Sequence, residues 1–418
     1  MSTRRLRSDD AWRTGAFVLV TLLAATACEV LPADDEKPPA RDVGPTDDAV
    51  GPDDLASALD GIAATDATRD ADVPGASDAV DAVPDLPPSQ CRHPDAESSG
   101  YLPWMLTVNT REQLLQLEGC TGIIELYIEN AVDVTDLLPL ESLTRVEKGL
   151  RIIGNPNLVD LMGLRNVSEI GGGLFVWKNA ALETVKLDAL LSVGLAEDYD
   201  PNLRVEENPA LKVVSFPVLE VTGASLTIAT DATTGPLGPW IQLPRLTSVG
   251  GAARLDDGGD LELPLLESVG RDFDLSGVYV FATLSLPKLR SVGGTLTLPK
   301  ASELYDQEVV LPALAHLGSG WFSGQKTLEL PALDTVDADL IIQDLYQTSL
   351  DLTALVEVGK DLAIEANTNL DSLTLPLLST VREDLYIRAN PKLPQEDVDE
   401  ILARVNVGGN TVVSGNLE

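Results

Sequence analysis

The sequence has few of the residues from which catalytic and metal sites are usually built. Its 418 residues include two histidines, His93 and His316, and three cysteines, Cys28, Cys91 and Cys120. This scarcity limits zinc sites and triad chemistry. The sequence also has no Gly-rich phosphate loop, His-Glu-x-x-His, Cys-x-x-Cys pair or nucleophile elbow. We therefore expect no enzyme activity, no cofactor and no metal site.

Aromatic and basic residues are also scarce. Phe, Trp and Tyr make up 4% of the chain, and 29 Lys and Arg face 66 Asp and Glu, which gives a net charge of −37. Nucleic acid and anionic membrane surfaces repel such a chain, so neither is an expected partner. A core built mainly from Leu and Val suits thin repeated layers better than one large globular centre.

The first 28 residues have the pattern of a bacterial export signal. Four arginines between positions 4 and 13 precede an apolar run at 16–27, which is too short to span a bilayer and has the length of a signal-peptide core. Cys28 follows and resembles the lipid-modified cysteine of bacterial lipoproteins, although Ala25 stands where such signals favour Leu. We expect a signal peptide at 1–27 and lipidation of Cys28. Ordinary cleavage after 25–27 is the alternative.

Residues 28–90 are predicted to form a disordered acidic tether. The stretch is rich in Asp, Ala and Pro and has no Phe, Trp or Tyr. Low hydrophobicity and high charge cannot offset the entropy of the chain. Calcium binding is the alternative function, but the acidic residues lack the alternating Asp/Asn and Gly spacing of a calcium loop. A spacer after a lipid anchor fits an outer-membrane lipoprotein of the cell envelope, surface-exposed or facing the periplasm.

The remainder of the chain repeats itself. The motif Leu-Pro-x-Leu-x-x-Val-Gly, with small variations, recurs about every 20 to 29 positions, which is typical of stacked solenoids. Its clearest members are residues 243–250, 263–270, 286–293, 311–318, 330–336, 352–359 and 375–381. The prolines fit corners between sheets, and the glycine after Val is expected to have a positive φ in a tight bend.

A short alternating segment of the form Leu-x-Ile follows each motif. Alternation of this kind indicates a strand with one buried face, so one strand per repeat is expected to stack into a parallel sheet. In several repeats Asn-Pro-x-Leu or a variant comes next, as at 155–158, 208–211 and 390–393. Because these asparagines recur at one phase, we expect them to point inward and hydrogen-bond the bends as a ladder; ligand contact is the alternative.

Together these elements resemble the receptor L-domain family. The residues that carry the resemblance are Cys120–Ile128 and the phased Gly-Leu-Arg-Ile-Ile-Gly-Asn-Pro-Asn-Leu at 149–158. The resemblance covers roughly 91–418 and implies a leucine-rich, right-handed parallel β-helix that binds protein ligands. Family lobes have about half as many coils, so we expect two solenoid halves, 91–230 and 231–418, or one elongated lobe.

The open ends of a solenoid need protection. Residues 108–117 are predicted to form a short helix with Asn109 or Thr110 as its cap, and residues 395–405 a second helix, followed by a strand at 410–414. In an oxidising envelope Cys91 and Cys120 are expected to form a disulfide worth about 3 kcal/mol, with free thiols as the alternative.

The alternation also predicts which side chains point outward. If Leu174 and Val176 are buried, their neighbours lie on the outer sheet face, where an aromatic and arginine cluster is typical of a binding hot spot. The candidate binding residues are Tyr127, Arg151, Phe175, Trp177, Arg204, Glu206 and Arg254, with Tyr386 and Arg388 farther along. The alternative is ordinary surface packing under loops.

We therefore expect a lipid-anchored recognition module that binds an unidentified protein or glycan ligand. A passive structural envelope protein is one alternative. A carbohydrate-active β-helix enzyme with a pair of carboxylates is another.

Overall fold

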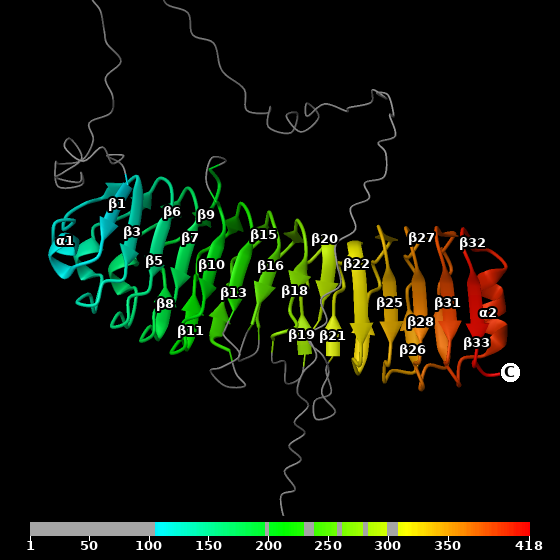
Figure 1. The fold of residues 1–418 in the computed structure, drawn as a ribbon. Helices are drawn as coiled ribbons and strands as arrows, with labels where there is room; N and C mark the ends of the chain where they lie inside the picture. The colour runs from blue at the N-terminus through cyan, green and yellow to red at the C-terminus, as the bar shows by residue number, and fades with distance from the viewer. Residues whose placement is uncertain (1–104, 197–199, 230–237, 257–260, 279–282, 299–307) are drawn as a thin grey trace, which may run out of the picture. The chain divides into compact units, whose positions relative to one another are not determined.

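The predicted fold class is confirmed. Parallel strands form a β-solenoid of the right-handed type with about 12 turns and very little helix (Figure 1). The computed structural model describes residues 105–196, 200–229, 238–256, 261–278, 283–298 and 308–418, all within one unit. The predicted signal peptide, the tether, Cys28, Cys91 and His93 lie outside these residues.

The alternating Leu-x-Ile segments form one column of strands, the long-strand column. Its members pair in parallel from one turn to the next, because each turn repeats the same apolar spacing. They are β1 (Met105–Val108), β3 (Glu125–Glu129), β5 (Leu150–Ile153), β7 (Leu174–Trp177), β10 (Leu203–Glu206), β13 (Leu226–Ala229), β16 (Ala253–Leu255), β18 (Phe273–Asp274), β25 (Leu340–Gln343), β28 (Leu362–Glu365), β31 (Leu385–Arg388) and β33 (Thr411–Ser414).

The last two residues of each Leu-Pro-x-Leu-x-x-Val motif, or the equivalent residues of the looser repeats, form a two-residue strand. These strands stack into a second column, the short-strand column. They are β2 (Gly122–Ile123), β4 (Arg145–Val146), β6 (Glu169–Ile170), β9 (Ser192–Val193), β12 (Val221–Thr222), β15 (Ser248–Val249), β17 (Ser268–Val269), β24 (Thr335–Val336), β27 (Glu357–Val358), β30 (Thr380–Val381) and β32 (Asn406–Val407). The longer strands β20 (Ser291–Thr297) and β22 (His316–Ser323) run through both columns and join them into one 25-stranded sheet.

Three smaller sheets form a third face, which the sequence analysis did not predict. One contains β8 (Thr184–Lys186), β11 (Val213–Ser215) and β14 (Trp240–Gln242). The others contain β19 (Thr283–Ser285), β21 (Glu308–Val310) and β23 (Thr327–Glu329), and β26 (Ser349–Asp351) and β29 (Ser372–Thr374). Many turns therefore contribute three strands, where the repeat pattern predicted one.

The core is a set of stacked aliphatic side chains. In the repeat at 263–270 the three apolar positions that define the motif, Leu263, Leu266 and Val269, are buried, while Leu265, at a variable position, is half-buried. Full burial of one such side chain stabilises the fold by roughly 1.5–3 kcal/mol. Small and large residues compensate across the layers: the buried ring of Phe273 lies in register beside Ala253. Interdigitation of this kind keeps the interior close-packed.

The predicted asparagine ladder is confirmed at both ends of the solenoid. The Asn179 Oδ1 accepts from the backbone N–H of Asn155 at 3.0 Å, and its Nδ2 donates to the Ile152 carbonyl at 2.8 Å. Asn155 acts in the same way on Ala131 and Ile128. A second ladder contains Asn367, Asn390 and Asn416. These side-chain amides satisfy the backbone N–H and C=O groups of each bend that would otherwise be buried without a hydrogen-bond partner.

The predicted role of the glycine after Val is wrong. Among the described glycines at this position, Gly194 is the one with a positive φ, at 77°. The others are needed because successive turns approach closely. A Cβ on Gly250 would lie 2.2 Å from the carbonyl oxygen of Gly223, and a Cβ on Gly270 would lie 2.2 Å from that of Gly250. A column of glycines therefore runs through the middle of the stack.

Short helices lie at both ends of the stack (Figure 1). The first, α1 (Arg111–Leu115), begins after Thr110, whose Oγ1 accepts from the N–H of Gln113, as one of the two predicted caps. The second, α2 (Gln395–Leu402), buries Val398 and Ile401. Buried Cys120 is disulfide-bonded, while its predicted partner Cys91 lies outside the described residues. Protection of the solenoid ends by these helices stays a prediction.

Strand pairing continues past the predicted division at residue 231. Leu226 of β13 pairs with Ala253 of β16, and Val213 of β11 pairs with Trp240 of β14. Most of the irregular stretch between them, 230–237, lies outside the described residues. Two single turns of 3-10 helix, η2 (Leu138–Leu140) and η3 (Met162–Leu164), form corners in neighbouring turns near the N-terminal end.

Candidate functional site

The in-register stacking of the long strands places one outward side chain above the next. Tyr127, Arg151, Phe175 and Arg204 are successive partners on β3, β5, β7 and β10. Adjacent strands lie about 4.8 Å apart. These four predicted residues therefore form the start of one line along the solenoid, which we call the central row.

Arg151 lies between two aromatic rings. Its guanidinium carbon is 4.7 Å from the ring centroid of Tyr127 and 5.2 Å from that of Phe175. Contacts at these distances are cation–π interactions. Within the described part of the chain no carboxylate forms an ion pair with Arg151. The two rings hold its position while its N–H groups stay available as donors.

Tyr127 is held in turn by an acidic side chain. Its hydroxyl donates to the Oε1 of Glu125 at 2.5 Å, and Glu125 is 7% exposed although it lies on the outer side of β3. Burial, together with this hydrogen bond, raises the pKa of Tyr127 to about 12. Tyr127 is therefore a neutral, fixed ring at any physiological pH.

A second outward line lies beside the central row. Ile153, Trp177 and Glu206 are in-register partners on β5, β7 and β10. The side chain of Trp177 is 38% exposed, and the Lys178 Nζ lies 4.1 Å from its ring centroid. Glu206 accepts from the Nη2 of Arg204 at 2.6 Å and from its Nε at 3.0 Å.

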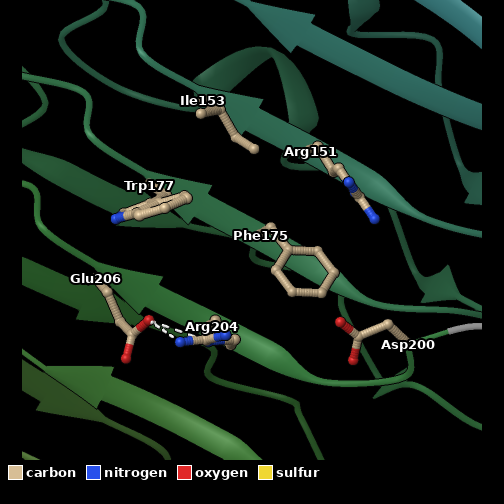
Figure 2. Close-up of a pocket in the computed structure, with 7 residues that line it drawn as sticks. All are labelled: Arg151, Ile153, Phe175, Trp177, Asp200, Arg204 and Glu206. Carbon is tan, nitrogen blue, oxygen red and sulfur yellow. Dashed lines mark hydrogen bonds and ion pairs between the residues drawn. The ribbon is translucent and has the colours of Figure 1, made fainter.

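The two lines enclose a hollow of about 210 Å³, shown in Figure 2. Figure 2 shows the rings of Phe175 and Trp177 side by side, with Arg151 and Arg204 on opposite sides of Phe175. The hollow is lined by Arg151, Ile153, Phe175, Trp177, Asp200, Arg204 and Glu206. The structure thus brings five of the seven predicted residues together, and Ile153 and Asp200 were not predicted.

A missing side chain explains the position of the Phe175 ring. A Cβ on Gly173 would lie 2.5 Å from the Cε2 of Phe175 and 2.3 Å from the carbonyl oxygen of Asp200. Because Gly173 has no Cβ, the ring can lie against the sheet and the chain at Asp200 can pass close by. A ring fixed in this way is a platform with little conformational entropy to lose on binding.

The two remaining predicted residues lie outside the hollow. Tyr127 adjoins it through Arg151. Arg254, on β16, is separated from Phe175 by β10 and β13, although it belongs to the same central row. The Arg254 Nη2 lies 3.5 Å from the Oδ2 of Asp256, and its Nε lies 4.0 Å from that of Asp274.

The central row ends in a second set of aromatic residues, which we call the second aromatic cluster. Of its members, Tyr386 and Arg388 were predicted from the sequence and Trp321 was missed. Trp321 of β22 is 59% exposed and pairs in register with Ile341, which is followed by Ala363 and Tyr386 on the next two strands. Arg388 lies over the ring of Tyr386 at 5.4 Å and is paired with Glu365. The strand of Trp321 breaks the Leu-x-Ile pattern because Gly320 occupies the leucine position, and this hid it.

His316 is partly exposed on β22. Its Nδ1 lies 3.1 Å from the Thr335 Oγ1, and its Nε2 lies 3.2 Å from the Asp337 Oδ2. The Thr335 hydroxyl also donates to Asp334 at 2.9 Å, so its proton is directed away from the imidazole. The cluster does not have the nucleophile–base hydrogen bond that acyl transfer requires.

The described residues contain neither a metal-binding cluster nor a helix that could span a membrane. No group of three or more His, Cys, Asp and Glu side chains in them could hold a metal ion. None of the helices they form combines the length and the apolar composition needed to cross a membrane. No family model, curated protein or solved structure matches the chain significantly.

Proposed function

We propose that this chain is a lipid-anchored envelope protein whose solenoid binds a ligand through the outer face of its long-strand column. The observation that carries the proposal is the hollow formed by Arg151, Phe175, Trp177 and Arg204. Trp, Tyr and Arg dominate binding hot spots, and a chain with 4% aromatic residues has two rings in this hollow and a third, Tyr127, beside it.

The sequence supports the anchor and the class of module. The basic segment, the apolar run and Cys28 favour an outer-membrane lipoprotein, and the acidic tether would hold the solenoid away from the lipid. The phased Gly-x-Leu-x-Ile and Asn-Pro-x-Leu elements resemble the receptor L-domain family, whose members bind ligands. A passive structural protein would have no need for fixed rings that are partly exposed on one face.

Site-directed photo-crosslinking tests the binding face. Trp177 is replaced by a diazirine-bearing amino acid in the full chain, expressed in the cells that make it. Trp240 of β14, which is 54% exposed on the third face, is the matched control position. We expect a discrete adduct from position 177 and none from position 240. Equal labelling from both positions, or no adduct from position 177, would refute the proposal.

Palmitate labelling tests the anchor separately. The wild-type chain should incorporate palmitate and fractionate with membranes, and Cys28→Ala should abolish both. Each buried methylene of an acyl chain contributes about 0.8 kcal/mol to membrane binding, so loss of the acyl chains should release the protein. Unchanged membrane retention of Cys28→Ala would contradict lipidation at this residue.

A further inference from the structure

The two aromatic clusters lie on one straight path. Phe175 and Trp321 both belong to the central row and are separated by six strand steps, β7 to β10, β13, β16, β18, β20 and β22. At about 4.8 Å a step, their backbones are ~29 Å apart along the solenoid. Both clusters face the same side of the long-strand column.

Among the described residues, those on the central row between the two clusters are polar or charged. The central row continues from Arg204 through Thr227, Arg254, Asp274 and Thr297 to Trp321. None of these intervening residues is aromatic or aliphatic beyond the threonine methyl groups. A ligand lying along the row would therefore meet a ring platform at each end and short polar or paired charged groups between them.

The charges along the path are largely paired with one another. Arg204 pairs with Glu206, Arg254 with Asp256, and Arg388 with Glu365. Such pairs offer N–H donors and carboxylate acceptors side by side with no net charge. This combination suits hydroxyl groups, which both donate and accept, better than it suits an ionised ligand.

The charge of the whole chain points the same way. A polyanion would approach a protein of net charge −37 against a repulsive field. A polycation would meet Arg151 beside the hollow, whose charge no ion pair within the described residues neutralises. An uncharged ligand meets neither obstacle.

The hollow at Phe175 sets the size of the unit that is recognised. Its volume of about 210 Å³ is below the roughly 300–1,000 Å³ typical of sites for drug-sized molecules. One ring-sized unit fits it, while the second platform lies ~29 Å away. The ligand is then a chain of ring units that is long enough to reach both platforms.

We infer that the central row binds a neutral, hydroxyl-rich polysaccharide that lies along the solenoid axis, with its sugar rings stacked on Phe175 and Trp177 at one end and on Trp321 at the other. The inference rests on the proposed binding function of this face and names its ligand class. Contact at two platforms also predicts that long chains bind more tightly than short ones, because the second contact is intramolecular.

Affinity electrophoresis of the full chain tests the inference. Native gels contain either a neutral glucan, mannan or xyloglucan, or the polyanions alginate or polygalacturonate. We expect retardation by at least one neutral polymer and none by the polyanions. Phe175→Ala or Trp321→Ala should each weaken retardation about tenfold, and the double variant about a hundredfold. Phe175→Tyr and Trp321→Phe, which keep a ring, should retain most of the binding.

Trp240→Ala is the matched control for Trp321→Ala, because Trp240 is 54% exposed against 59% for Trp321 but lies on the third face. No retardation in any neutral gel, retardation by polyanions alone, or equal loss in Trp240→Ala would overturn the inference. The crosslinking experiment distinguishes failure of the proposed binding face from failure of the proposed polysaccharide ligand. A protein adduct from position 177 with no glycan would leave the binding face standing and refute the polysaccharide, whereas no adduct at all would refute both.

Discussion

The turns near the two ends of the described solenoid have a stacking contact that the turns in its middle lack. At the ends, buried asparagines such as Asn179 and Asn390 hydrogen-bond the bend of the neighbouring turn. In the middle, stacking relies on Gly223, Gly250 and Gly270, which let each turn approach the carbonyl of the one before, as Gly171 and Gly408 also do near the ends. The asparagines add buried hydrogen bonds, and the glycines remove side chains. Both give the same parallel register, so the fold does not depend on one repeated residue.

The asparagine ladder should give the largest effect. Asn179→Ala removes the acceptor of the buried Asn155 N–H and the donor to the Ile152 carbonyl, and we expect a loss of about 3 kcal/mol of unfolding free energy. The midpoint of urea denaturation measures it. Exposed Asn157, which donates to the Val132 carbonyl, is the control, and Asn157→Ala should cost less than about 1 kcal/mol. Equal losses of unfolding free energy in Asn179→Ala and Asn157→Ala would mean that the buried ladder does not stabilise the end turns more than a surface hydrogen bond does.

The glycine column should give the next largest effect. A Cβ on Gly250 would meet backbone atoms that cannot swing away, so Gly250→Ala should lose about 2 kcal/mol of unfolding free energy. Gly122 has no atom within 4 Å of the position of a Cβ and provides the control. Gly122→Ala should be neutral or slightly stabilising. A neutral Gly250→Ala would show that the middle turns are less tightly stacked than the ends.

The smallest effect concerns tyrosines at equivalent positions toward the two ends. Tyr127 donates to Glu125 and Tyr386 donates to Asp384, and in both cases the pKa of the tyrosine is raised, for Tyr127 from 10.0 to about 12. The stabilisation from neutral Tyr127 should be complete below pH 10 and lost between pH 10 and 12, because the folded pKa exceeds the unfolded one.

The raised pKa values of Tyr127 and Tyr386 can be measured by an absorbance titration of tyrosinate. Comparison of the wild-type chain with Tyr127→Phe should assign one of the last phenols to ionise to Tyr127. Tyr386→Phe is the matched variant at the other end. If the curve for Tyr127→Phe differs from that of the wild type near pH 10 and not near pH 12, burial and the bond to Glu125 do not hold this phenol neutral.

The sequence predicts the long-strand column well, because each strand buries two aliphatic residues around one outward residue. That alternation also identifies Tyr127, Arg151, Phe175 and Trp177 as outward neighbours. The two-residue strands and the third face could not be predicted, since a strand with one buried residue shows no alternation. The role of Gly250 depends on the carbonyl of Gly223, 27 positions earlier in the chain, and no local pattern contains that contact.

Trp321, in the second aromatic cluster, was missed for a related reason. At β22 the leucine of the repeat is replaced by Gly320, and the ring of Phe322 fills the space, since a Cβ on Gly320 would lie 2.8 Å from its Cε2. Gly320 and Phe322 together supply the apolar volume that Leu and Ile supply in the other repeats. The segment therefore does not match the Leu-x-Ile pattern. Trp321 lies between the buried residues Gly320 and Phe322, and the strand register identifies it as an outward residue.

The most direct test of the account is the distance between its two ring platforms. Spin labels at positions 175 and 321 of the full chain, measured by pulsed electron paramagnetic resonance, should give a single narrow distribution. It should be centred near ~29 Å, from six parallel strand steps of about 4.8 Å. A broad distribution, or a mean that differs from this value by more than the reach of the two labels, would contradict the in-register stack and with it the binding face.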